Sequence, residues 1–228
     1  MEKFIPTERF YRNLIKVENL KKFVVKVKET DILVFAEKNL KKEIEEEVKK
    51  QREILETYIK IHPEFYLSFS PVEIESDEEI IKLMSLSSKL TKTGPMASVA
   101  GAISEIVGRK FLSQSEQIFI ENGGDIFMNL KNEVKIGIYA GKSPFSMKIG
   151  IKIKRENPVG IATSSGTVGH SFSYGDADAV TVISNSSAFS DGAATYFGNL
   201  VKGKIDKELI EREPVSYTHL TLPTICSV

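Results

Sequence analysis

A carboxylate and a hydroxyl lie one helical turn apart near the end of the chain, at Asp191 and Thr195. Residues 190–202 are expected to form a helix capped by Ser190, and positions i and i+4 of a helix face the same side. Two hard oxygen ligands so placed suit Mg²⁺, which takes further ligands from waters and substrate phosphates. The small residues 192–194 would let another backbone approach and supply a carbonyl oxygen. Considered alone, the pair is better explained by Asp191 complementing its own helix dipole and Thr195 packing nearby.

Glycine adjoins polar residues at two further places. The run Asn122-Gly123-Gly124-Asp125 lies between two apolar segments, and Asn-Gly and Gly-Gly both tolerate the positive φ of a tight hairpin turn. The missing side chains would also let backbone N–H groups contact a ligand, so a plain turn and a binding turn are about equally supported. Gly94 lies at an expected helix start, whose free N–H groups suit a phosphate or another anion. Considered alone, that segment is better explained as an ordinary helix start.

A segment rich in hydroxyls and glycine, 160–170, contains Thr163-Ser164-Ser165-Gly166 and ends at His170. A solvent-exposed loop is the simplest interpretation. A Ser/His nucleophile pair oriented by Asp176 or Asp178 is a second, but the chain lacks the Gly-x-Ser-x-Gly elbow typical of serine hydrolases. Hydroxyl and backbone contacts to a phosphate or to the edge of a ring are therefore favoured over serine hydrolysis.

The rest of the chain predicts the elements that position these groups. Two β-rich runs around a polar turn predict a hairpin over residues 23–36, and helically spaced apolar residues predict a long helix over 40–61. Further helices are expected over 77–86, 93–112 and 190–202, and further strands over 117–120, 126–130, 134–139, 147–153 and 179–184. The short connections favour antiparallel pairing. The expected fold class is α+β, a mostly antiparallel sheet with packed helices.

Charge and hydropathy narrow the classes of function. The 228 residues include 31 Lys+Arg and 31 Asp+Glu, which gives a formal net charge of zero. This balance argues against nucleic-acid binding and against attachment to an anionic membrane surface. No run approaches the roughly 20 apolar residues of a membrane span. The N-terminus has no apolar segment typical of an export signal, so a cytoplasmic protein is expected.

The C-terminal segment is of a different kind. Back-translated, residues 215–224 match one frame of a transposon end used in sequencing libraries. Residues 214–228 are therefore interpreted as adapter read-through, and residues 1–213 as a single domain truncated at its C-terminal end. A native β-rich tail is the alternative. The adapter interpretation removes Cys226 and His219, which leaves no cysteine for a disulfide, a thiolate nucleophile or a metal site.

Taken in order, the glycine, hydroxyl and acidic segments resemble the ApbE-like flavin transferase superfamily. Its members carry a glycine-containing helix start, an Asn-x-Gly-Gly-Asp-like turn, an Ala-Thr-Ser-Gly-like loop, a Val-Thr-Val strand and an Asp-Ala-x-Ala-Thr helix. The corresponding segments here are 94–105, 122–125, 161–166, 180–182 and 191–195. The ordered set is more specific than any single motif. It is most similar to a compact branch of that superfamily whose function is not established, rather than to the flavin transferases themselves.

The resemblance implies an ApbE-like fold that binds FAD in a cleft between helices and sheet, with Mg²⁺ at the pyrophosphate. The implied reaction cleaves FAD and transfers FMN to a threonine of an acceptor protein. Asp191 and Thr195 correspond to metal ligands, and Gly94, residues 122–125 and residues 163–166 correspond to cofactor contacts. A module that binds a flavin, a nucleotide or another small ligand without catalysis is the alternative, and a scaffold that keeps only the fold is a third hypothesis.

Two departures from the superfamily pattern bear on the reaction. Ser98-Val99-Ala100-Gly101 stands where the family has a Lys-Gly pair. The His-x-Ile-Asp-Pro-x-Thr-Gly stretch of the family is shortened here to residues 173–178. The resemblance makes His170 a candidate catalytic base, and the shortening leaves open whether it aligns with the family histidine. The fold and the cleft are therefore expected to be retained more fully than the transfer reaction.

Overall fold

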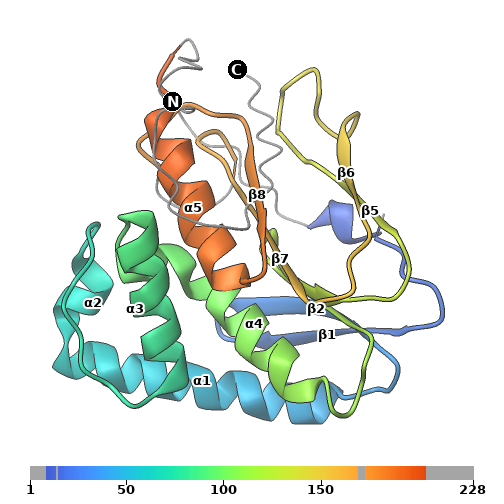
Figure 1. Ribbon diagram of the computed structural model, residues 1–228, viewed down its shortest axis with the longest axis horizontal. Helices are drawn as coiled ribbons and strands as arrows, with labels where there is room; N and C mark the ends of the chain where they lie inside the picture. The colour runs from blue at the N-terminus through green and yellow to red at the C-terminus, as the bar shows by residue number, and fades with distance from the viewer. Residues whose placement is uncertain (1–8, 14, 169–172, 204–228) are drawn as a thin grey trace.

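The structure is a computed structural model that describes residues 9–13, 15–168 and 173–203 (Figure 1). His170 and the segment 214–228 lie outside the described residues, as does the domain boundary expected at residue 213. Within the described ranges, no helix combines the length and the apolar character needed to cross a membrane.

The main sheet has six strands in the order β1-β2-β3-β4-β7-β8, and every neighbouring pair is antiparallel (Figure 1). Its strands are β1 (Lys21–Val27), β2 (Thr30–Ala36), β3 (Ile118–Asn122), β4 (Asp125–Asn129), β7 (Val159–Ser164) and β8 (Val180–Ser184). A separate two-stranded sheet pairs β5 (Val134–Gly137) with β6 (Gly150–Ile153). The expected α+β class with a mostly antiparallel sheet is confirmed.

Strand β7 corrects the interpretation of residues 160–170 as a loop. The first half of this segment belongs to a buried strand, which pairs with β4 on one side and with β8 on the other. A Cβ at Gly160 would lie 2.2 Å from the backbone nitrogen of Ser187, so the strand approaches a helix too closely for a side chain at that position. Glycine and hydroxyl residues are typical of loops, so the sequence of this segment resembles one. Here these residues instead allow the strand to pack closely against its neighbours.

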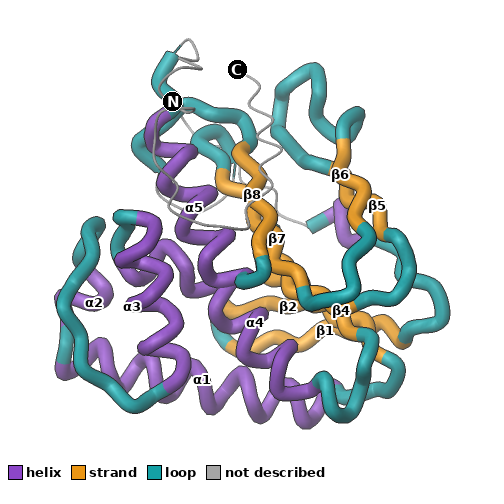
Figure 2. The backbone as a smooth tube through the Cα atoms, in the orientation of Figure 1, coloured by secondary structure: helices purple, strands orange, loops and turns teal. Residues whose placement is uncertain are grey.

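The helices gather on one side of the main sheet (Figure 2). They are α1 (Lys41–Ile61), α2 (Pro63–Leu67), α3 (Glu79–Thr91), α4 (Val99–Phe111) and α5 (Ser187–Leu200), with 3₁₀ turns η1 (Phe10–Asn13) and η2 (Pro95–Ser98). Helix α4 packs on β3 and β4, whereas α5 packs on β7 and β8. The site segments of the sequence therefore converge where α4, α5 and the β4–β7 part of the sheet meet.

Two helix starts differ from those expected. The helix predicted from residue 93 is interrupted, because η2 precedes the α-helical turns that begin at Val99. Helix α5 begins at Ser187, and its cap is Ser186, whose hydroxyl accepts a hydrogen bond from the N–H of Phe189 at 3.2 Å. Ser190, the expected cap, is buried and donates its hydroxyl to the carbonyl oxygen of Gly160 at 3.1 Å. Since Ser186 satisfies a free N–H one turn earlier, Ser190 is available to bind the sheet.

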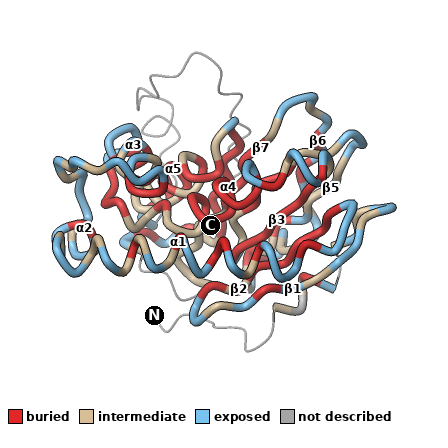
Figure 3. Tube along the Cα trace, turned by 90° about the horizontal axis from the view of Figure 1, so that it is seen from below, coloured by how far each residue is buried: buried red, intermediate tan, exposed pale blue. Residues whose placement is uncertain are grey.

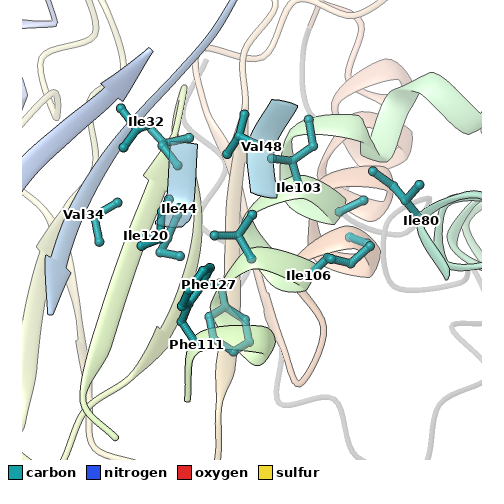
Figure 4. Packing of buried hydrophobic residues seen from close by; sticks show 14 of the residues in the cluster. Ile32, Val34, Ile44, Val48, Ile80, Ile103, Ile106, Phe111, Ile120 and Phe127 are labelled. Atoms are coloured by element: carbon teal, nitrogen blue, oxygen red, sulfur yellow. The ribbon is translucent and has the colours of Figure 1, made fainter. Parts of the chain in front are cut away.

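The main sheet is buried on both faces, as expected from side chains that alternate along each strand. Ile32, Val34, Ile120 and Phe127 point to the helices, where they meet Ile103 and Ile106 of α4 (Figure 4). The opposite face contributes Leu33, Phe35, Phe119 and Ile126, which pack with residues of β5 and β6. Figure 3 shows these buried segments running through the centre of the molecule, with exposed residues along the outer side of α1 and α2. The sheet and α4 therefore form a rigid base for the site.

Candidate functional site

Helices α4 and α5 cross closely at Gly101. A Cβ at this position would lie 2.3 Å from the carbonyl oxygen of Ser187, so the crossing requires glycine. Asp191 Oδ2 of α5 accepts a hydrogen bond from the N–H of Gly101 at 2.9 Å. In return, Glu105 Oε2 of α4 accepts one from the N–H of Ala188 at 3.1 Å. Each helix thus supplies a carboxylate to the free N–H groups at the start of the other.

The position of Asp191 corrects the simpler interpretation of this residue. It does not serve only the dipole of its own helix, because its carboxylate binds the first turn of α4. Burial raises the pKa of Asp191 to about 7, while the N–H groups of Gly101 and Ala100 act in the opposite direction. Asp191 is half-buried, and its carboxylate contacts the first turn of α4.

Asp125 brings a second carboxylate to the same place. Burial raises the pKa of Asp125 well above its usual range, and the negative charges of Asp191 and Glu121 raise it further. The N–H of Thr163 donates a hydrogen bond to Asp125, which acts against that rise. Asp125 from β4 and Asp191 from α5 therefore form a pair of neighbouring carboxylates at the junction of sheet and helices.

The tight turn predicted between β3 and β4 is confirmed. Asn122 pairs with Asp125 across a two-residue turn, and Gly123 and Gly124 have φ values of 70° and 111°. The Asn122 side chain donates from Nδ2 to the carbonyl oxygen of Ala100 at 3.2 Å, which ties the turn to the start of α4. The turn thus lies beside the start of α4, where Asp191 also binds.

The hydroxyl-rich end of β7 divides into two parts. Thr163 shares a hydrogen bond with Thr181 of β8 at 2.9 Å between their Oγ1 atoms, and the Ser164 side chain lies near Gly198 of α5. Ser165 Oγ instead accepts hydrogen bonds from the next residues of its own turn, the N–H groups of Thr167 at 3.1 Å and Val168 at 2.9 Å. Thr163 therefore adjoins the junction through Asp125, Ser164 lies toward the C-terminal end of α5, and Ser165 stabilises the local turn.

Two of the glycines predicted to contact the cofactor, Gly94 and Gly166, lie where another backbone segment approaches closely. A Cβ at Gly94 would lie 1.9 Å from the carbonyl oxygen of Ser68, and one at Gly166 would lie 2.1 Å from that of Gly175. Both glycines are therefore required by packing, whether or not they also contact a ligand. Thr195 is half-buried on α5, one turn beyond Asp191.

The residues expected to assist His170 have other described partners. Asp178 accepts a hydrogen bond from the hydroxyl of Thr167 at 3.1 Å, and Asp176 accepts one from the N–H of Gly203 at 3.0 Å. These contacts give each aspartate a role in the local loop structure. The pairing of either aspartate with His170 stays a prediction.

The donor set at the junction fits Mg²⁺ better than a transition metal. Two carboxylates and nearby hydroxyl oxygens are hard ligands. Burial raises the pKa of both Asp125 and Asp191 and so disfavours their ionised forms, which a bound cation would stabilise. Over the described ranges, no group of three or more His, Cys, Asp or Glu side chains is arranged to hold a metal ion. A magnesium ion here would need oxygens from Thr195, the backbone, waters and a ligand.

Sequence reasoning missed a buried charged cluster next to the turn. Glu121 is fully buried and accepts hydrogen bonds from Arg12 Nε at 2.6 Å, the Tyr11 hydroxyl at 2.9 Å and the N–H of Gly124 at 2.9 Å. The available signal was a glutamate that ends the apolar run Ile118-Phe119-Ile120 directly before the glycine turn. Its arginine partner lies 109 positions away, so local spacing does not reveal the pair.

Comparison with known proteins decides the family. A family model described as "AbpE bacteria" matches residues 12–220. The chain belongs to this family. A similar curated relative, the UPF0280 protein MJ1526 of Methanocaldococcus jannaschii, is 44% identical over 189 residues, which cover 81% of this chain and 77% of the relative. A UPF0280 protein of Methanococcus vannielii is 42% identical over 191 residues, with the same two coverages. The resemblance noted in the sequence is thereby confirmed at the level of family.

A solved structure supports the fold. The Pseudomonas stutzeri flavinyl transferase ApbE, in its apo form, superposes with a TM-score of 0.52 at 13% sequence identity. The match covers 80% of this chain and 84% of that one. At this identity the similarity establishes a shared ApbE-like architecture, so ligand and reaction have to be argued from the residues of the junction.

Proposed function

We propose that this protein is a Mg²⁺-dependent, cytoplasmic flavin-nucleotide-binding protein that binds FAD at the junction of α4, α5 and the β3–β4 turn. The observation that carries the proposal is the Asp125–Asp191 carboxylate pair, which meets at the start of α4 next to a glycine turn. A cation held by these carboxylates would offset their negative charge and that of a bound pyrophosphate. The membership of the AbpE family and the ApbE-like fold favour a flavin over other nucleotides.

The roles follow from the positions of the side chains. Asp191 and Thr195 would hold the metal, and Asp125 would add negative charge beside it. Gly94, residues 122–125 and residues 163–166 would contact the cofactor through backbone groups and hydroxyls. Bound Mg²⁺ would supply polarisation of the phosphoryl oxygens.

We further propose that the protein cleaves FAD and transfers FMN. In this reaction the hydroxyl oxygen of an acceptor protein's threonine forms a bond to the FMN phosphorus, and the bond to AMP breaks. His170 is the candidate base that takes the threonine proton, and AMP leaves with the electron pair of the broken bond. The acceptor threonine belongs to another protein.

A binding module without catalysis is the second candidate. It is favoured by the shortened segment 173–178 and by the local hydrogen bonds of Asp176 and Asp178, which already serve the loop. In this case FAD or a related nucleotide would bind without being cleaved, and the carboxylate pair would contribute to binding but not to catalysis.

The test is a titration of the full chain with FAD, with and without Mg²⁺, followed by chromatography for AMP. Binding that requires Mg²⁺ and is lost in Asp191→Asn supports the site, and AMP release in the presence of a threonine-containing acceptor supports the enzyme. The matched control is Asp77→Asn, which removes a fully exposed carboxylate that pairs with Lys82. Binding without AMP supports the module, and failure of wild-type protein to bind any flavin nucleotide rejects the proposal.

A further inference from the structure

The N-terminal segment brings a guanidinium group to the glycine turn. Arg9 Nη1 donates a hydrogen bond to the carbonyl oxygen of Asp31 at 2.7 Å and lies 3.9 Å from Glu121 Oε1. The other terminal nitrogen, Nη2, is the atom nearest to a Cβ placed on Gly123, at 3.7 Å. One side of the guanidinium is therefore anchored, and the other lies over the open backbone of the turn.

The charge of Arg9 also reaches the carboxylate pair. It lowers the pKa of Asp125, in opposition to burial and to the neighbouring acids. The Arg9 side chain is 31% exposed, which leaves it accessible to a ligand. Among the residues that the structure describes, no acceptor forms a hydrogen bond with Nη2.

Arg12, three residues further on, differs in this respect. Its Nε binds Glu121 at 2.6 Å, its Nη1 binds Asp31 Oδ1 at 2.6 Å, and its Nη2 donates to the carbonyl oxygen of Asp31 at 2.7 Å. Since the N–H of Gly124 also binds Glu121, Arg12 orders the turn through that carboxylate. Within the described ranges, the Arg12 donors are committed to the protein, whereas Arg9 Nη2 has no hydrogen-bond acceptor and lies near the turn.

We propose that Arg9 is a ligand-binding residue that donates hydrogen bonds to a phosphoryl group held at the Gly123–Gly124 turn. The inference rests on the proposed function in that it uses the same cleft, but it concerns the anionic group rather than the flavin. A planar guanidinium with free N–H groups matches phosphate oxygens in a bidentate manner. It would also offset the charge that a polyanion meets from Asp125 and Asp191.

The test uses inorganic pyrophosphate with Mg²⁺ as the probe, titrated calorimetrically into the full chain. Arg9→Ala is expected to weaken binding roughly 10-fold or more, the effect of losing charge-assisted hydrogen bonds. Arg9→Lys should lose less affinity than Arg9→Ala, because lysine keeps the positive charge but lacks the paired N–H donors of the guanidinium. Arg155→Ala is the matched control, since Arg155 donates a hydrogen bond to Asn185 Oδ1 at 3.1 Å, just after the end of β8.

Flavin ligands separate this inference from the proposed function. FAD and FMN should lose affinity in Arg9→Ala, while riboflavin, which has no phosphate, should bind wild type and variant alike. If pyrophosphate binding depends on Arg9 but no flavin binds, the flavin proposal fails and the role of Arg9 stands. If wild type does not bind pyrophosphate, or binds it no better than Arg9→Ala does, the inference is overturned. Melting temperatures identify a variant that fails to fold, in which case Arg9→Gln replaces Arg9→Ala.

Discussion

The half of the sheet covered by α1 and α4 and the half covered by α5 are held together by different interactions. In the first, large aliphatic and aromatic side chains such as Ile44, Val48 and Phe127 are almost completely buried. In the second, backbone meets backbone at Gly101 and Gly160. Aliphatic packing is stabilising and non-directional, whereas close backbone contact brings N–H groups, hydroxyls and carboxylates into hydrogen-bonding range. The α5 half also has a buried apolar cluster, which includes Val180, Val182 and Phe197, but it additionally brings polar groups together.

The largest effect on stability is expected in the aliphatic half. The Phe127 ring packs against Gly108 of α4, where a Cβ would lie 2.0 Å from it. Phe127→Ala should lower the free energy of unfolding by about 3–5 kcal/mol, because it removes buried apolar surface and leaves a cavity. Denaturant unfolding measures the loss, and Phe145→Ala at a half-exposed position is the control. Equal losses in the two variants would contradict the assignment of this region as the main source of stability.

A smaller loss is expected where helices α4 and α5 cross. Gly101→Ala should destabilise the protein by about 1–3 kcal/mol, because the new Cβ forces the helices apart. Separation of the helices would also break the contact of Asp191 with the N–H of Gly101, so FAD affinity should fall further than stability alone explains. Gly137→Ala is a suitable control, because its Cβ would meet only the flexible end of Met147. Unchanged affinity in Gly101→Ala would show that the crossing does not position the ligand site.

A gain in stability is expected from neutralising one carboxylate. Because the folded state raises the pKa of Asp191 to about 7, above its usual 3.8, the native protein retains that proton more tightly than the unfolded chain. This contribution to stability is present at low pH and is lost as the pH rises through 7. Asp191→Asn keeps an oxygen for the N–H of Gly101 and should be more stable than wild type at pH 8, with the difference shrinking toward pH 5.

Melting temperatures across this pH range test the expectation, with Asp77→Asn as the control. Parallel pH profiles for wild type and Asp191→Asn would mean that the Asp191 carboxylate does not penalise the fold.

The smallest effect on stability is expected at the second proposed metal ligand. Thr195→Val preserves the shape of a half-buried residue, so the free energy of unfolding should change by less than about 1 kcal/mol. The affinity for Mg²⁺ in the presence of FAD should nevertheless fall, because one oxygen donor is lost. Thr195→Ser restores the hydroxyl and should restore affinity. Wild-type metal affinity in Thr195→Val would remove this residue from the proposed site.

The sequence predicts the parts of this structure that depend on local patterns. The hairpin of β1 and β2, the long helix α1 and the glycine turn between β3 and β4 follow from alternation, helical spacing and positive φ. It does not predict that Ser190 turns inward or that β7 is a buried strand, because contacts with α5 and the sheet determine both. The Arg12–Glu121 pair was missed for the same reason, since tertiary folding alone brings its two members together.

The exchange of carboxylates between α4 and α5 has a consequence for how this region opens. If α5 separates, the start of α4 loses its acceptor at Asp191, and Glu105 loses the N–H of Ala188. Fraying of either helix start would therefore leave a backbone N–H group without its acceptor and a carboxylate of the other helix without its donor. The two helices should open as one cooperative unit, and hydrogen exchange should report the same protection for the amides of Gly101 and Ala188.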